Sequence, residues 1–172
     1  MALLAEEIVE EWLNRQGYFT IRGVKLGVHE MDILAIKLND DGTHDCRHIE
    51  VQASLNPISY ITRVPKDVQK ETGRSASSAK RREDDELIRG VQEWIEKKFL
   101  LSAKKQLRDS LCAEKWSYEL VVHRVRHPEE LDAFARQNIV VLGLDNIIKA
   151  LRSQNYPIKR ASGGDLADLI LL

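Results

Sequence analysis

The segment from Arg47 to Leu55 constrains the fold of this chain more than any other stretch, because polar and apolar residues alternate along it. A strand turns successive side chains to opposite faces. One face carries Ile49, Val51, Ala53 and Leu55, and the other carries His48, Glu50, Gln52 and Ser54. The apolar face fits a protein core. A buried strand that served only packing would not carry polar groups along its second face, so that face is a candidate site.

A second strand-like run, residues 31–36, is apolar on both faces except for Asp32. Burying a carboxylate costs several kcal/mol unless something pairs with it. Mg²⁺ is bound in proteins through one or two carboxylates together with water and substrate phosphate. The sequence therefore predicts a Mg²⁺ or Mn²⁺ ion between Asp32 and Glu50. Glu30 lies on the face of Asp32 and is either an outer ligand or an exposed acid at the strand end.

Asp32 and the run Glu50-Val51-Gln52 resemble the PD-(D/E)xK nucleases, whose pattern is an acid on one strand and Glu-x-Lys on the next. The resemblance implies a restriction-endonuclease-like α/β core of order αβββαβ, with a mixed β-sheet flanked by helices on both faces. It also implies a metal-dependent endonuclease that hydrolyses DNA phosphodiester bonds. Gln52 departs from the commonest pattern, since the family's Lys belongs there, although some restriction enzymes of the superfamily carry Gln.

Glu6 is a candidate site residue because of a narrower resemblance, to Holliday-junction resolvases and type IV restriction-like nucleases. These carry a helical Glu at a fixed spacing before a Gly-aromatic pair, and Glu6 and Gly17-Tyr18 stand at that spacing. On helical periodicity alone, Glu6 lies at the border of the apolar stripe of the first helix. Periodicity favours a solvated acidic face made of Glu6, Glu7, Glu10 and Glu11, and only the family spacing singles out Glu6.

The resemblance assigns a role to each matched residue. Asp32 and Glu50 would be direct metal ligands, and the carbonyl of Val51 a third. Glu6 would hold the water around the metal or a second ion. Gln52 can hydrogen-bond water but carries no charge and cannot act as an acid or base. A nuclease fold that binds nucleic acid without cutting it is the alternative, and an interaction protein without nucleic acid would leave the polar face of the strand unexplained.

A locally basic stretch offers contacts for DNA, although the net charge of −1 gives the whole chain no attraction to nucleic acid. Only Asp67 and Glu71 oppose its cations. Those cations are Arg63, Lys66, Lys70, Arg74, Lys80, Arg81 and Arg82. Residues 72–82 are small, polar and basic, so we predict a basic flexible loop over 63–82, either a flap that contacts phosphates or a solvated linker.

Periodicity and turn residues predict the remaining elements. Helices are expected over 3–16, 83–111, from 127 and near 145–151, and strands over 18–24, 31–38, 47–54, 116–125 and 138–142. The order αβββ–αβαβα indicates a mixed sheet covered on both faces. The long helix over 83–111 carries five basic residues and would cover the sheet; they are Lys97, Lys98, Lys104, Lys105 and Arg108. The apolar tail over 163–172 is expected to dock on the body or on another subunit.

Length and composition set the remaining bounds. Residues 1–172 suit one domain. No apolar run is long enough to span a membrane and no signal peptide is visible, so a cytoplasmic protein with no membrane contact is expected. Cys46 and Cys112 are interpreted as two ordinary reduced thiols. His44, Cys46 and His48 would share a strand face and include zinc-ligand types, but a fourth ligand is missing. Without a visible recognition domain, specificity would come from loops, a homodimer or a partner.

Overall fold

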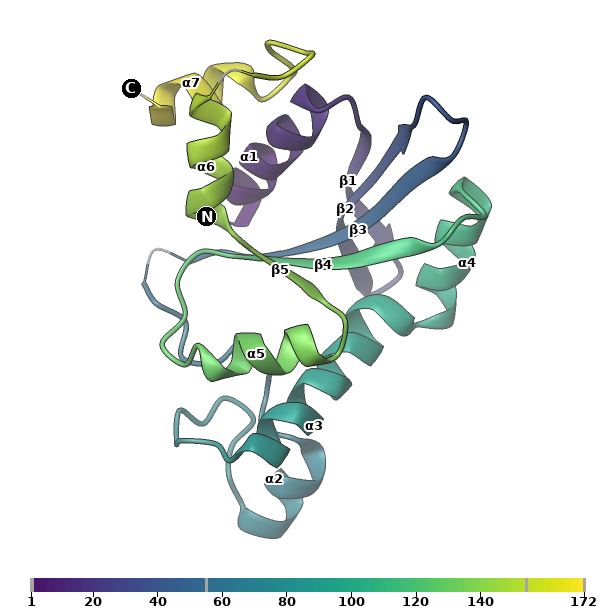
Figure 1. Ribbon diagram of the computed structural model, residues 1–172. Coiled ribbons are helices and arrows are strands. Elements are labelled where there is room, and N and C mark those ends of the chain that lie inside the picture. The colour runs from purple at the N-terminus through teal and green to yellow at the C-terminus, as the bar shows by residue number, and fades with distance from the viewer. Residues whose placement is uncertain (1, 55, 154, 172) are drawn as a thin grey trace.

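The computed structural model describes residues 2–54, 56–153 and 155–171, and one mixed sheet runs through it (Figure 1). The sheet contains β1 (Phe19–Leu26), β2 (His29–Leu38), β3 (His44–Gln52), β4 (Trp116–Val122) and β5 (Val140–Gly143), side by side in chain order. β1, β2 and β3 pair antiparallel, and β4 and β5 continue parallel to β3.

Helices lie on both sides of this sheet (Figure 1). One side holds α1 (Ala2–Arg15), α6 (Leu144–Arg152) and α7 (Gly164–Leu171). The other holds α2 (Lys66–Thr72), α3 (Asp84–Ile95), the π-helical turn η1 (Glu96–Leu100), α4 (Ser102–Leu111) and α5 (Glu129–Arg136). The predicted α/β class, with a mixed sheet flanked on both faces, is confirmed. No helix among the described residues is long and apolar enough to cross a membrane.

β3 uses its two faces as its alternation predicts. Ile49 and Val51 are buried in the core formed with α1 and α6, and Ala53 packs against that core. His48 and Glu50 lie on the opposite face and are also fully buried. Leu55, predicted on the apolar face, lies outside the described residues. The polar face is therefore covered by protein, which requires partners for each of its groups.

The ladder between β2 and β3 opens at Asp32. Its last pair is Ile33 with Ile49, and the same register places Asp32 opposite Glu50 without a ladder bond. Instead the Asp32 carboxylate accepts a hydrogen bond from the backbone N–H of Val51, at 2.8 Å. On the other side of β2, Gly23 stands opposite Asp32 in the register with a φ of 66°, a backbone conformation that favours glycine. The two strands thus separate where the predicted site residues lie.

The single helix predicted over 83–111 is wrong, because the structure divides it. α3 runs into the π-helical turn η1, and Leu101 then ends the helix with an extended backbone (φ −56°, ψ 136°) before α4 begins. Within η1, Phe99 is fully buried and stacks on Tyr118 of β4, with ring centroids 4.8 Å apart. Packing of this ring on the sheet accompanies the change in helix geometry.

The C-terminal tail docks on the body of the protein, which is one of the two positions predicted for it. α7 contacts α1 and α6, and Ala167 lies in their shared core. The last residue, Leu172, lies outside the described residues. Glu11 of α1 is fully buried, and its carboxylate accepts hydrogen bonds from the backbone N–H groups of Ala161 and Gly163, both at 3.1 Å. Assigning Glu11 to a solvated acidic face is therefore wrong.

The segment over 63–82 is not one irregular loop, since α2 forms within it. Arg82 is buried and its guanidinium donates to the hydroxyl of Thr62, at 2.8 Å. Arg74 pairs with Glu86 at 2.9 Å. Arg82 therefore cannot contact phosphates in this conformation, which corrects its assignment to the basic loop. The exposed basic residues of the segment are Arg63, Lys66, Lys70, Lys80 and Arg81.

Candidate functional site

Glu50 is the centre of a buried charged cluster on the covered face of β3. Its side chain is 0% exposed. One carboxylate oxygen, Oε2, accepts a hydrogen bond from the ammonium group of Lys98 at 2.5 Å. The other, Oε1, lies 3.6 Å from the ammonium nitrogen of Lys104. Burial raises the pKa of the Glu50 carboxyl, and the two ammonium groups act against that rise. The folded chain thus supplies cations around a carboxylate that β3 buries.

Asp32 faces Glu50 across the opening between β2 and β3. Burial raises the pKa of the Asp32 carboxyl, the charge of Glu50 raises it further, and the hydrogen bond from Val51 lowers it. In a strand, the N–H and C=O of one residue point to the same edge. The carbonyl of Val51 therefore points into the opening that holds the Asp32 carboxylate. Two close carboxylates repel each other, and a shared cation would relieve that repulsion.

Two further acids add negative charge to the opening. Glu6 of α1 is partly buried, and its pKa is raised first by burial and then by the charge of Asp32. Glu30 and Glu50 raise it as well, while Arg22 lowers it. Glu6 thus lies close enough to respond to both strand carboxylates. Of the predicted acids, Asp32 and Glu50 lie opposite each other in the register, and Glu6 lies within range of their charges.

η1 and α4 supply the cations of the cluster. Burial lowers the pKa of Lys98, but the charge and hydrogen bond of Glu50, together with the charges of Asp32 and Glu30, outweigh burial, so the net shift is upward. Burial lowers the pKa of Lys104, whose ammonium group donates to the carbonyls of Glu30 at 2.6 Å and Lys98 at 2.8 Å. Four carboxylates lie around these two ammonium groups, and Arg22 is a further cation beside Glu6. Those carboxylates belong to Glu6, Glu30, Asp32 and Glu50.

His48 joins this cluster as a neutral hydrogen-bond donor. Burial and then the charge of Arg108 lower the pKa of His48. The Arg108 guanidinium, which can only donate, lies 3.0 Å from Nδ1 of His48, so Nδ1 accepts and the ring proton sits on Nε2. That nitrogen lies 3.2 Å from Glu50 Oε1. Arg108 also donates to the hydroxyl of Tyr118 at 3.1 Å and is fixed from two sides.

The zinc interpretation of His44, Cys46 and His48 finds no support. His44 pairs with Glu114 at 2.9 Å, while His48 faces Glu50. In the described part of the chain, no group of three or more His, Cys, Asp or Glu side chains is placed to hold a metal ion. Mg²⁺ needs fewer protein ligands, because it keeps several waters and takes oxygen atoms from substrate. Asp32, Glu50 and the Val51 carbonyl offer only oxygen donors, which fits that ion.

Gln52 lies on the face of Glu50, partly buried and uncharged. Lys98 and Lys104 were not predicted as site residues, because only the turn η1 and the break at Leu101 direct them toward Glu50. The predicted basic residues lie around α2, at the end of the molecule away from α7 (Figure 1). No family model, curated protein or solved structure matches this chain. Its function must therefore be inferred from the geometry of the site.

Proposed function

We propose that this protein is a metal-dependent endonuclease that hydrolyses DNA phosphodiester bonds at the opening between β2 and β3. One observation carries the proposal. Asp32 and Glu50 stand opposite each other where the ladder ends, the Val51 backbone faces the same opening, and the ammonium group of Lys98 lies 2.5 Å from Glu50. A purely structural sheet would not place two carboxylates opposite each other in its interior.

Phosphodiester hydrolysis requires an activated water molecule, alignment with the phosphorus atom and stabilisation of charge on the phosphate. Asp32, Glu50 and the carbonyl of Val51 would hold Mg²⁺ or Mn²⁺, and Glu6 would orient the surrounding water or a second ion. When bound, such an ion stabilises negative charge as a Lewis acid and lowers the pKa of water. Burial of the two strand carboxylates limits competition from bulk solvent.

Lys98 supports activity despite the uncharged Gln52. Its ammonium group contacts Glu50, and its side chain is 23% exposed and so remains accessible from solvent. From that position it can donate to a phosphate oxygen, whereas Gln52 can only hydrogen-bond water. We therefore assign the positive charge of the site to Lys98. Lys104, which is 1% exposed, holds the backbone of Lys98 in place.

A nucleic-acid-binding module without catalysis is the second candidate. The Glu50 carboxylate already contacts Lys98, Lys104 and His48, so its charge has partners without a metal. Gln52 adds no charge to the site. In this case the exposed basic residues around α2 would bind DNA, and the carboxylate cluster would serve stability alone.

Cleavage of supercoiled plasmid and of branched DNA, with Mg²⁺ or Mn²⁺ and with a chelator, separates these functions. The wild type is expected to nick DNA only with metal. Asp32→Asn and Lys98→Gln should each lose ~10²-fold in rate, the usual effect of removing one group that stabilises charge in a transition state. Lys97→Gln is the matched control, because Lys97 is the exposed neighbour of Lys98 in η1 and should cut like the wild type.

The other outcomes are equally informative. DNA binding without cleavage under any metal condition would favour the binding module. Cleavage by Asp32→Asn at the wild-type rate would refute the site. Gln52→Lys restores the family's usual residue; metal-dependent cleavage gained only in this variant, and lost again when Glu50→Gln is added, would identify a scaffold one residue from activity.

A further inference from the structure

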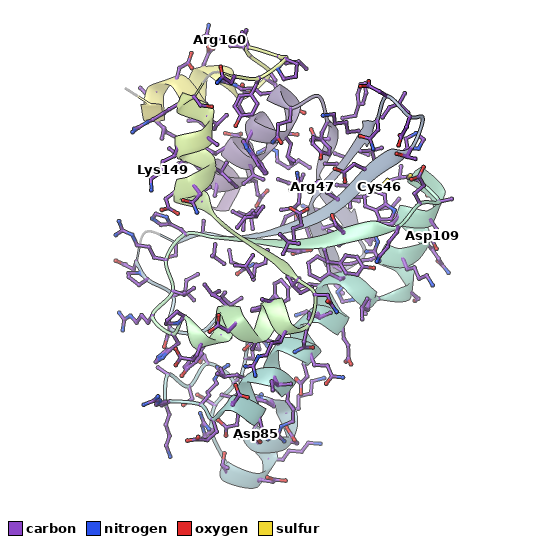
Figure 2. The ribbon with its side chains drawn as sticks, viewed as in Figure 1. Cys46, Arg47, Asp85, Asp109, Lys149 and Arg160 are labelled. Atoms are coloured by element: carbon purple, nitrogen blue, oxygen red, sulfur yellow. The ribbon has the colours of Figure 1, made fainter. Side chains whose placement is uncertain are left out.

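Cys46 and Cys112 lie next to each other although they are 66 residues apart in the chain. Their Sγ atoms are 2.8 Å apart, and both residues are free cysteines. Cys46 is on the face of β3 that also carries His48 and Glu50, and Cys112 directly follows α4. Figure 2 shows Cys46 on β3 near the far end of α4. Since a disulfide needs an S–S distance of about 2.05 Å, the two sulfur atoms have less than ~1 Å left to close.

The two thiols have different surroundings. Cys46 is 2% exposed and packs with Met31, Leu34 and Trp116. Burial, followed by the contact with Cys112, raises the pKa of Cys46 to about 12, so this thiol stays protonated at neutral pH. Cys112 is partly exposed, and its carbonyl accepts the indole N–H of Trp116 at 3.1 Å. One accessible thiol beside a buried partner is the arrangement of an attacking and a resolving cysteine.

We propose that Cys46 and Cys112 are a modification site, at which a hydroperoxide converts the two thiols into a reversible intramolecular disulfide. The inference goes beyond the proposed nuclease function and does not depend on it. Both residues are free thiols in the structure, as the sequence predicts, and the proposal adds a reversible oxidised state. The geometry carries it, since the pair joins a central strand to the end of a helix.

The chemistry takes two steps and balances with one hydroperoxide. The thiolate of Cys112 attacks the peroxide, forms an S–O bond, breaks the O–O bond and becomes a sulfenic acid, while the leaving oxygen takes up a proton as an alcohol or water. The sulfur of Cys46 then attacks the sulfur of Cys112, loses its proton and displaces the hydroxyl group as water. Two thiols give up two electrons, and the peroxide accepts both.

The bond would attach the end of α4 to β3. α4 carries Lys104 and Arg108, which contact Glu50 and His48 of the same strand. In the reduced chain, the thiol contact and the hydrogen bonds of His44 with Glu114 hold that helix end to β3. A disulfide between residues 46 and 112 would close a long loop of the unfolded chain and so stabilise the fold.

Treating the full-length protein with stoichiometric hydrogen peroxide, and separately with an organic hydroperoxide, tests the proposal. We expect both thiols to disappear together, an intact mass lower by roughly 2 Da, and a cross-linked peptide that contains both cysteines. The thermal midpoint should rise by about 5–15 °C and return after treatment with dithiothreitol.

Two single variants provide the controls. Cys112→Ser removes the accessible thiol at an exposed helix end; it should keep Cys46 reduced at the same dose and show no rise in midpoint. Cys46→Ser should leave a sulfenic acid on Cys112 that a dimedone reagent traps. If Cys46→Ser fails to fold by circular dichroism, Cys112→Ser alone decides. Two persistent thiols, a disulfide between two chains on a non-reducing gel, or a rise in midpoint retained in Cys112→Ser would each overturn the proposal.

Discussion

Glu50 is a fully buried carboxylate approached by three nitrogen-bearing side chains, and these have separate roles. Lys104 and His48 are buried with it, and each has a further partner that fixes it in place. Lys98 alone of the three reaches solvent. Lys104 is therefore the cation that the fold buries beside Glu50, whereas under the proposed function Lys98 would exchange Glu50 for a phosphate.

The first prediction separates this structural role from the site chemistry. Lys104→Met keeps a long side chain but removes the donor from the backbone carbonyls of Glu30 and Lys98 and a cation from beside the buried carboxylate of Glu50. The free energy of unfolding should fall by about 1–3 kcal/mol, the usual cost of leaving buried polar groups without a partner. Lys105→Met, at the exposed next position, should change it by less than ~0.5 kcal/mol. Urea denaturation measures both, and equal values for the two variants would contradict the role of Lys104.

A second prediction concerns Tyr18, whose hydroxyl donates to the carboxylate of Asp45. Burial and then this hydrogen bond raise the pKa of Tyr18 to about 12. In the unfolded chain a tyrosine titrates near pH ~10. Between these two values the unfolded state loses a proton that the folded state keeps, so stability falls as the pH rises through this window. The urea concentration at the unfolding midpoint should fall more steeply between pH 9 and 11.5 for the wild type than for Tyr18→Phe. Parallel pH profiles of the two proteins would refute the raised pKa of Tyr18.

At the scale of elements, the helical region after residue 83 was the least predictable. Its apolar residues keep helical spacing, and that pattern does not distinguish an α-helix from one that contains a π-helical turn. The turn redirects Lys98, so its contact with Glu50 could not be read from sequence. The alternation in β3 predicted which of its side chains share a face, because strand geometry has a strict period of two, whereas the pairing of Asp32 with Glu50 was expected only with the help of the family resemblance.

Gly90 supplies a test of how α3 packs. A Cβ atom at this position would lie 3.0 Å from the hydroxyl of Thr62 and 3.1 Å from the carbonyl of Arg63. Thr62 cannot retreat easily, because Glu130 and Arg82 both hydrogen-bond to it. Gly90→Ala should therefore destabilise the fold, although alanine favours a helix by about 1 kcal/mol. Gln92→Ala, an exposed position on α3, should be neutral or slightly stabilising. Thermal denaturation compares them, and a more stable Gly90→Ala would show that the packing is loose.

For the whole molecule, the sheet and its two helical layers were predictable from the order of elements. The position of the basic residues was not, since their contacts depend on distant segments. Arg82 shows why: its partner Thr62 and the neighbouring Glu130 belong to a buried network that joins the segment after β3 to α5. Local composition reports a basic stretch but cannot tell which of its cations the fold buries.

The exposed cations lead to a prediction about DNA. Replacing Lys66, Lys70, Lys80 and Arg81 with Gln should weaken duplex binding and flatten its salt dependence by about one unit of slope for each phosphate that the variant no longer neutralises. The control replaces Lys105, Lys115, Lys149 and Arg152, also exposed, with the same change in net charge. Fluorescence anisotropy at several salt concentrations measures both. Equal losses of affinity in the two variants would mean that net charge alone attracts DNA.

The five strands lie in the sheet in the same order as in the chain, which affects how the sheet can assemble during synthesis. No strand has to enter between two strands that are already paired, so each new strand adds to the growing edge as it leaves the ribosome. α1 and the first three strands can associate before the long crossover over 53–115 has been made. Until that crossover arrives, the polar face of β3 stays in water, and Glu50 needs no cation. The cluster over Glu50 cannot close before that crossover has been made, because Lys98 and Lys104 lie within it.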